Sequence, residues 1–293
     1  IRLQEIMLQN SSILKIIDSA VERQFQSADV NTIISVIKKI EPNAESIVEF
    51  IYLLDSFGTA VYDASQQKIR CINQRKIYSD GLDDKGELYL GRKLSSYMRA
   101  PDIYWKIFEK YSDKFVKLSD VAKQKTGVKT GCDGFFILNQ ARQAEWNIEE
   151  QFLLPLFRSS TECMEVYLDK KMLQTVLFYC NIPKGRLQGT NALKYIEWGE
   201  EQGYHQWAKP KTQRLWYGVG ELSTAPIVCP RSMNEIFRTF MNKAEVVSNF
   251  RLSNIYPKGD FALELCAILN STLTSLMVEL GARTGLGQGL VDM

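Results

Sequence analysis

Hydrophobic and polar positions alternate in short blocks along the chain, and their period changes from block to block. Residues 1–9 have the spacing of the end of an amphipathic helix, whereas residues 13–18 and 31–38 are apolar, β-branched blocks typical of strands inside a sheet. A helix, a strand, a loop and a second strand, in this order, are typical of a unit that closes an α/β sheet. The pattern therefore predicts a mixed α/β fold.

The next part of the chain has weaker patterns. Apolar runs at residues 47–54 and 68–72 alternate with turn residues, and residues 80–86 form a polar connector. A helix over residues 103–111 is predicted, because Pro101 fits the first helical turn and Asp102 suits the positive end of the helix dipole.

The second half of the chain alternates between strand and helix patterns. We expect a short helix at 118–122, a strand at 135–138, a helix at 149–157, strands at 173–179, 226–231 and 250–257, and helices at 191–201 and 263–280, the last with Asn270-Ser271 in its middle. This order predicts a mixed sheet with helices. We place a domain boundary before Leu94, which divides the chain into residues 1–93 and 94–293.

The stretch from Val128 to Leu138, V-K-T-G-C-D-G-F-F-I-L, joins a basic turn to an apolar run. Gly131 and Gly134 allow positive φ and a close backbone approach, and Lys129 lies beside them. Backbone N–H groups of a Gly-rich turn next to a Lys suit an anion such as phosphate. The spacing is not that of a phosphate-binding Walker loop, so an ordinary surface hairpin explains it equally well.

A second candidate is the run from Lys209 to Tyr217, K-P-K-T-Q-R-L-W-Y, which interleaves basic and aromatic residues. Such a run suits nucleic acid, since Lys and Arg contact phosphates or guanine edges and aromatic rings stack on bases. Arg158, Ser159 and Ser160 could likewise donate to phosphates. A turn with an adjoining strand, or a plain Ser-Ser turn, is the alternative.

The net charge of +2 hides an uneven distribution. Residues 1–60 carry five Lys or Arg against eight Asp or Glu, whereas residues 203–258 carry eight against three. A polyanionic partner therefore becomes plausible for the second half, although eight charges over this length also fit a solvated surface.

Composition excludes several classes of protein. No apolar run approaches the roughly 20 residues of a membrane span, and no signal peptide opens the sequence, so we expect no membrane partner and a cytoplasmic location. The six Cys residues include no C-x-x-C pair, which argues against zinc and for reduced thiols. His205 is the single histidine, which excludes a multi-histidine metal site; we expect no metal.

Several short motifs, taken in order, resemble a known family. They are R-A-P-D-I-Y at 99–104, L-S-D-V at 118–121, the stretch from Val128 to Leu138, and Y-I-E-W-G-E at 195–200. Together they are similar to the C-terminal half of adenine-specific DNA methyltransferases of the type IIG restriction-modification kind. The resemblance covers almost the whole chain, but no motif is diagnostic alone.

This resemblance implies two regions with different roles. Residues 1–93 would be the end of a Rossmann-like methyltransferase sheet with a connector, and residues 94–293 a target-recognition domain of mixed sheet and helices. The Gly-rich S-adenosylmethionine loop and the N-P-P-Y motif of the family do not occur in the sequence. We therefore expect no catalytic residue and no cofactor site here, and we expect S-adenosylmethionine to be bound by a catalytic domain preceding Ile1 in the same polypeptide.

The resemblance also implies a partner, double-stranded DNA, read by sequence. The residues expected to contact DNA are Lys129, Thr130, Arg158, Ser159, Lys209, Lys211, Arg214, Trp216, Arg231 and Arg283. One alternative is a scaffold or interaction domain without any nucleic-acid role. A free-standing hydrolase is a weaker alternative, because there is one histidine and no nucleophile motif.

Overall fold

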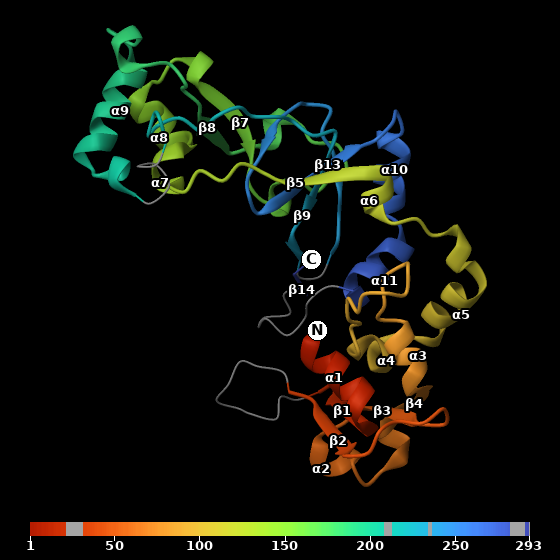
Figure 1. Cartoon of the computed structure of the whole chain (residues 1–293). Coiled ribbons are helices and arrows are strands. Elements are labelled where there is room, and N and C mark those ends of the chain that lie inside the picture. Colours follow the sequence, from red (N-terminus) through yellow and green to blue (C-terminus); the bar gives the residue numbers. More distant parts are fainter. Residues whose placement is uncertain (22–31, 208–212, 234–235, 282–290, 293) are drawn as a thin grey trace. The chain divides into compact units, whose positions relative to one another are not determined.

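The computed structural model describes residues 1–21, 32–207, 213–233, 236–281 and 291–292 of the 293-residue chain. The chain divides into two compact units (Figure 1), the first made of Ile1–Lys114 and Leu276–Met293 and the second of Phe115–Ser275. Each unit contains both helices and strands, which confirms the mixed α/β fold. The assignment of residues 1–93 and 94–293 to two functional domains stays a prediction.

The first unit is built on one sheet with the strand order β2-β1-β3-β4. Its strands are β1 (Ser12–Ser19), β2 (Ile34–Lys38), β3 (Ile47–Leu53) and β4 (Gln67–Asn73), and its helices are α1 (Arg2–Asn10), α2 (Phe57–Ala60), α3 (Gln74–Ser79), α4 (Ser95–Arg99) and α5 (Asp102–Tyr111). β1 and β3 are parallel, and the other pairs are antiparallel. Apolar side chains of β1 and β3, including Ile16 and Phe50, pack against Ile77 and Tyr97 in the core.

β2 differs from its predicted position inside the sheet. All five of its residues are exposed, including Ile34, Val36 and Ile37, and β2 pairs only with β1 among the described strands. An apolar, β-branched run shows that a residue block favours a strand, but not how many of its faces are covered. The strand was predicted correctly, and its burial was wrong.

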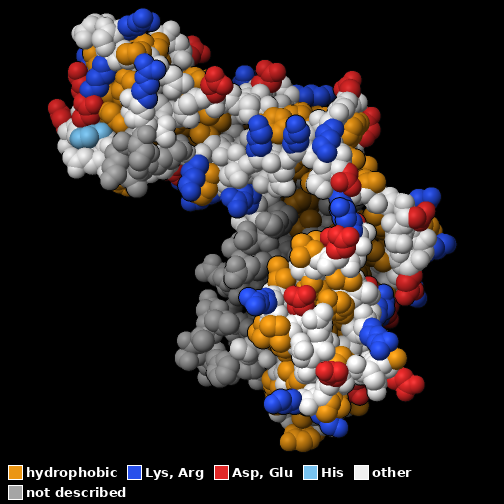
Figure 2. All heavy atoms as spheres, viewed as in Figure 1, with side chains coloured by type: hydrophobic (Ala, Val, Ile, Leu, Met, Phe, Trp, Pro, Cys, Tyr) orange, Lys and Arg blue, Asp and Glu red, His pale blue; other side chains and the backbone are white. Residues whose placement is uncertain are grey.

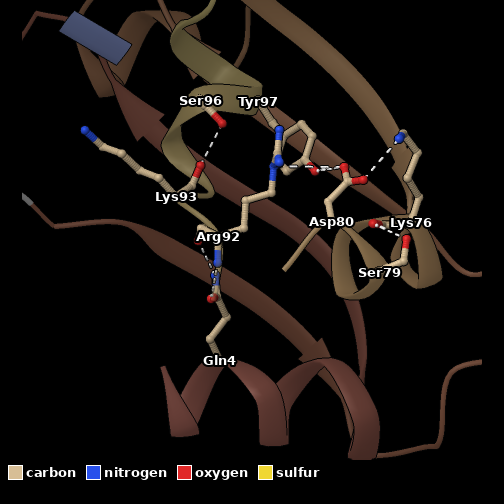
Figure 3. A network of polar contacts seen from close by, with 8 residues as sticks. All are labelled: Gln4, Lys76, Ser79, Asp80, Arg92, Lys93, Ser96 and Tyr97. Atoms are coloured by element: carbon tan, nitrogen blue, oxygen red, sulfur yellow. Dashed lines mark hydrogen bonds and ion pairs between the residues drawn. The ribbon is translucent and has the colours of Figure 1, made fainter. Parts of the chain in front are cut away.

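A polar network ties the connector after α3 to two helices (Figure 3). The buried Tyr97 hydroxyl donates to Asp80 Oδ2 at 2.7 Å, and the Arg92 guanidinium lies 5.3 Å from the Tyr97 ring centroid. Gln4 of α1 exchanges two hydrogen bonds with the Arg92 backbone, of 2.8 and 3.1 Å. Burial raises the pKa of Tyr97, and its bond to Asp80 adds to this, so the phenol stays a donor. The polar connector is thus fixed to α1 and α4.

The second unit contains two four-stranded sheets, with the orders β11-β9-β13-β5 and β12-β7-β8-β6. Its strands are β5 (Ala122–Thr126), β6 (Ile137–Asn139), β7 (Leu153–Phe157), β8 (Thr175–Phe178), β9 (Ile227–Pro230), β10 (Ser232–Met233), β11 (Phe240–Met241), β12 (Val247–Ser248) and β13 (Leu252–Pro257). Its helices are α6 (Leu118–Val121), α7 (Asp133–Phe136), α8 (Gln140–Trp146), α9 (Asn191–Glu201) and α10 (Ala262–Leu269). α11 (Thr272–Gly281) and β14 (Val291–Asp292) follow.

An aromatic cluster forms much of the second unit's core. The Phe135 ring is fully buried and lies 4.8 Å from the Tyr195 ring of α9 and 4.6 Å from the Trp216 ring. Phe135 and Phe136 belong to the helical turn α7 and not to the predicted strand, which begins only at Ile137. Both Phe N–H groups donate to Cys132 O, so the backbone completes a turn before the strand starts.

The segment at 149–157 was wrongly predicted to be helical. Its second part is β7, which pairs antiparallel with β8 and parallel with β12. Pro155 lies within this strand, opposite Val176. Proline lacks the N–H that a helix interior needs, and the pairing with distant strands decides the structure over the local helical spacing.

The predicted helix 263–280 is two helices, α10 and α11, bent by 63° at Asn270 and Ser271. The Asn270 amide pairs with the buried backbone of Thr239: its Nδ2 donates to Thr239 O and its Oδ1 accepts from Thr239 N, both at 3.0 Å. Ser271 Oγ accepts from Thr274 N at 3.2 Å and so caps α11. No single helix among the described residues is long and apolar enough to cross a membrane, although this bent pair passes by length and composition.

Asn270→Ala should lower the free energy of unfolding by about 1–3 kcal/mol, because the buried Thr239 N–H and C=O lose their partner. Urea denaturation measures the change. Asn10→Ala, at an exposed position, is the matched control and should change stability by less than about 0.5 kcal/mol. Equal effects of the two substitutions would show that the Asn270 pairing does not stabilise the fold.

Candidate nucleic-acid interface

The sequence A-K-Q-K-T-G-V-K-T-G runs from β5 into the Gly131 turn and carries three lysines. Among the described strands β5 pairs with β13 alone and so forms an edge of its sheet, with Lys123 opposite Tyr256 and Lys125 opposite Asn254. Because side chains alternate along a strand, Lys123 and Lys125 lie on the same face, and both are exposed. Figure 2 shows Lys and Arg side chains gathered on the face of this unit that carries β5.

Gly127 lies where the chain passes from the sheet that contains β5 to the sheet that contains β12. Its N–H donates to Leu252 O at 3.0 Å, and the next residue, Val128, donates to Ser248 O at 2.7 Å and accepts from Phe250 N at 2.9 Å. A Cβ atom on Gly127 would lie 2.3 Å from Asn249 O, closer than any side chain tolerates. The position thus requires glycine, and the two flanking lysines, Lys125 and Lys129, are held on a fixed backbone.

An open groove of about 170 Å³ lies along this crossing. Its lining residues are Lys125, Thr126, Gly127, Val128, Lys129, Val219, Glu221, Leu222, Ser223, Val247, Ser248, Asn254 and Tyr256. The Lys125 ammonium lies 5.5 Å from the Tyr256 ring centroid, and the Tyr256 and Ser223 hydroxyls are 2.8 Å apart. With two lysines against the single carboxylate of Glu221, the groove is suited to a negatively charged, extended ligand.

The turn after the groove holds Lys129 outward and Thr130 inward. Thr130 Oγ1 is buried, donates to Asp133 Oδ1 at 2.6 Å and accepts from Cys132 N at 3.2 Å. Its hydroxyl therefore has no proton left for a phosphate, which argues against the expected DNA contact. Gly131 has φ of +76°, as its sequence position predicted, whereas Gly134 lies in α7 and is not among the glycines with positive φ.

Arg158 and Ser159 follow β7. The Arg158 N–H donates to Glu162 Oε2 at 3.1 Å, and Ser159 Oγ lies 2.9 Å from Thr161 Oγ1. Burial raises the pKa of Glu162, although the Arg158 N–H and charge act in the opposite direction. Ser159 thus stabilises the turn that follows β7, and the Arg158 side chain is half-buried beside it.

Trp216 and Arg214 have different environments. The half-buried Trp216 ring packs on Phe135 at the margin of the core, and its indole N–H donates to Glu200 Oε1 at 2.8 Å, so these contacts argue against base stacking. Burial would raise the pKa of Glu200, but the bonds from Lys184 and Trp216 outweigh it and the pKa is lowered. Arg214 is exposed and lines a separate pocket with Asn181 and Gln213.

Two arginines flank Phe250 at the start of β13. Arg231 Nη1 donates to Phe250 O at 3.4 Å, and the Arg251 guanidinium lies 6.0 Å from the Phe250 ring centroid. Since Phe250 N donates to Val128 O, this pair adjoins the backbone that carries Lys129. Backbone pairing thus brings the segments of Lys129 and Arg231 together.

Sequence reasoning missed three basic residues in this region, of which Lys125 lines the groove. Lys123, Lys125 and Arg251 were not among the expected contacts, yet the alternation K-Q-K at 123–125, separated from Gly127 by Thr126 alone, would have indicated two of them. The expected contacts Lys209, Lys211 and Arg283 lie outside the described residues. As DNA contacts, all ten expected residues stay predictions.

Comparison with known proteins identifies relatives of the chain. Residues 104–293 match the model of the C-terminal domain of the type II methyltransferase M.Eco57I. The type II methyltransferase M.AccI of Acinetobacter calcoaceticus is 28% identical over 138 residues, which are 43% of this chain and 25% of that protein.

Two solved structures are similar in fold. One is the type IIL restriction-modification enzyme MmeI in complex with DNA, with a TM-score of 0.52 and 12% identity over 97% of this chain and 34% of that one. The other is the type IIG restriction endonuclease BpuSI, with a TM-score of 0.48 and 12% identity over 99% and 36%. The chain thus spans about a quarter of the length of M.AccI and about a third of the two solved enzymes.

Proposed function

Because the chain belongs to the family of the C-terminal domain of the type II methyltransferase M.Eco57I, it is part of a type II restriction-modification methyltransferase, and we propose that it recognises double-stranded DNA by sequence. The observation that carries this proposal is the groove at Gly127, with lysines held on both sides of a sterically restricted backbone crossing. Phosphate contacts by lysine give affinity and fix the register on the duplex, whereas base-edge contacts give specificity.

Arg214 is the best candidate for a base-edge contact among the described residues. It is exposed and lines a pocket with two amide side chains, Asn181 and Gln213. Arg pairs with guanine edges and Asn or Gln with adenine edges, so this set has the donors and acceptors that read bases in the major groove.

We propose further that the full protein methylates adenine, with S-adenosylmethionine bound by a catalytic domain to which the sheet of the first unit belongs. The exposed apolar residues of β2, whose outer edge has no partner among the described strands, support this proposal. An apolar strand of that kind suits continuation of the sheet by further chain.

The double variant Lys125→Ala/Lys129→Ala should weaken binding to every duplex similarly, because phosphate contacts carry no sequence information. In the full-length protein, the slope of log affinity against log salt should fall by about 1.8, since each phosphate contact contributes about 0.9. Fluorescence anisotropy over a range of salt concentrations measures this slope. The cognate duplex is first found by selection from random sequences.

The control is Lys170→Ala/Lys171→Ala, which removes two exposed lysines of the same unit outside the groove. It should leave the slope unchanged. If the unaltered protein shows no salt-dependent binding to duplexes at low ionic strength, the lysines only solvate the surface and the scaffold alternative is preferred.

A further inference from the structure

A second pocket lies at the edge of the sheet β12-β7-β8-β6 and has a volume of about 220 Å³. Its lining residues are Ile137, Asn139, Arg142, Arg158 and Thr175. Asn139 at the end of β6 is paired with Thr175 at the start of β8, and Arg158 directly follows the last residue of β7. Neighbouring antiparallel strands therefore bring these residues to one end of the sheet.

The two guanidinium groups of the pocket differ in how firmly they are held. Arg142 Nη1 donates to Gly134 O, and its guanidinium lies 5.4 Å from the Trp198 ring centroid, so its position is fixed from two sides. None of the hydrogen bonds or ion pairs found among the described residues uses the Arg158 guanidinium; the nearby Glu162 carboxylate accepts from the Arg158 backbone N–H instead. The Arg158 charge interacts with the Glu162 carboxylate at longer range, but no hydrogen bond in the described part of the chain occupies its guanidinium N–H groups.

The other polar groups of the pocket fit an anion. Asn139 Oδ1 accepts from Arg142 N at 2.9 Å, which leaves the Asn139 amide as the end that donates. The Thr175 hydroxyl donates to Leu156 O at 3.3 Å. No Asp or Glu lines the pocket. Two guanidinium groups and an amide are the donors that bind a phosphate, and a planar Arg fork can hold two of its oxygens at once.

Backbone pairing connects this pocket to the groove at Gly127. Phe157, the residue before Arg158, accepts from Asn249 N at 2.9 Å, and Asn249 forms a parallel bridge with Val128. A short series of backbone contacts thus links the segment of Arg158, through the buried Asn249, to the segment of Lys129. A nucleic-acid backbone presents phosphates at regular intervals, so one duplex can supply phosphates to both sites, whereas a free phosphate occupies only one.

We propose that Arg142 and Arg158 form a phosphate pocket that holds one backbone phosphodiester of the duplex, in addition to the phosphates at the lysine groove. This proposal rests on the DNA-recognition function proposed above. Arg158 provides the fork, and Arg142 provides a second, pre-positioned charge. The pocket sets the register of the duplex on the protein.

Arg158→Gln in the full-length protein should weaken duplex binding about tenfold at low salt, because a charge-assisted pair of hydrogen bonds is lost. The salt slope should fall by about 0.9, with the order of preferred sequences unchanged. Arg158→Lys should restore the slope but not the full affinity, since Lys keeps the charge without the fork. Arg75→Gln, at an exposed position in α3, is the control and should change neither quantity.

A set of duplexes, each with one neutral methylphosphonate in place of a phosphate, tests the contact directly. One substituted position should weaken binding by the unaltered protein about tenfold and leave Arg158→Gln unaffected, because that contact is already lost. Suppose that Arg158→Gln still binds the duplex with the full salt slope and is weakened by methylphosphonate at every position that weakens the unaltered protein. The pocket assignment is then wrong, and the proposed function stands. Absence of salt-dependent duplex binding by the unaltered protein overturns both.

The same variants distinguish the source of the phosphate. Inorganic phosphate at constant ionic strength should not raise the melting temperature of the unaltered protein more than that of Arg158→Gln. A rise that Arg158→Gln abolishes, together with unchanged duplex binding, would assign the pocket to a free phosphate and overturn the DNA assignment.

Discussion

Replacing Phe135 by Ala should lower the free energy of unfolding of the second unit by about 3–5 kcal/mol, the largest effect that we expect from a single substitution. The Phe135 ring is fully buried and contacts five aromatic rings, those of Phe136, Phe178, Tyr195, Tyr204 and Trp216. Removing it leaves a cavity that rings anchored on α9 and β8 cannot fill by small shifts.

The Phe135→Ala prediction extends to the backbone of the groove, which lies in the same unit. The Tyr195 hydroxyl donates to Phe135 O at 2.6 Å, so α9 and α7 are joined by this bond as well as by ring packing. Urea denaturation followed by tryptophan fluorescence measures the loss, because Trp216 belongs to the cluster. Tyr62→Ala, at a residue 89% exposed, should change stability by less than about 0.5 kcal/mol. A loss below about 1 kcal/mol for Phe135→Ala would contradict the proposed role of the cluster.

Gly127→Val should lower stability by about 1–3 kcal/mol or more and also abolish duplex binding at the groove. The new Cβ would meet Asn249 O at 2.3 Å and Ser248 O at 2.5 Å. Both are backbone atoms, held by the bonds of Val128 N to Ser248 O and of Asn249 N to Phe157 O, so relief requires the two sheets to separate locally.

The control for Gly127→Val is Gly185→Val. Gly185 is exposed, has no positive φ, and has no atom within 4 Å of an added Cβ. Gly185→Val should leave both the free energy of unfolding and the duplex affinity near the values of the unaltered protein. Circular dichroism shows whether the Gly127 variant stays folded, and a folded variant with full duplex affinity would show that the groove does not contact DNA.

The elements that sequence predicted correctly are those whose local pattern and packing agree. Alternating or β-branched runs predicted β1, β8, β9 and β13, and Pro101 with Asp102 marked the start of α5. The missed elements depend on distant residues. Asn270 breaks the last long helix because it pairs with Thr239, and β7 is a strand because β12 and β8 lie beside it. No local period contains such partners.

Contacts with distant residues also decide which side chains of the candidate site are available, and the sequence does not show them. A basic run shows that charges are close along the chain, but burial decides which groups are free. Thr130 and Trp216 looked available in sequence, and the structure uses both internally. The pairing of β5 with β13 places Lys125 at the groove. Arg142 and Arg158 line one pocket because β6 and β7 both pair with β8.

The two exposed sheet edges, β5 and β2, have unequal consequences for solubility. β5 carries lysines at alternate positions, and a charge on an edge strand prevents another chain from adding a strand there. β2 presents Ile34, Val36 and Ile37, and its single charge, Lys38, stands at the last position of the strand. In concentrated solutions of this chain by itself, β2 is therefore the edge at which intermolecular strand addition and aggregation should begin, and Val36→Lys should delay their onset in light-scattering measurements.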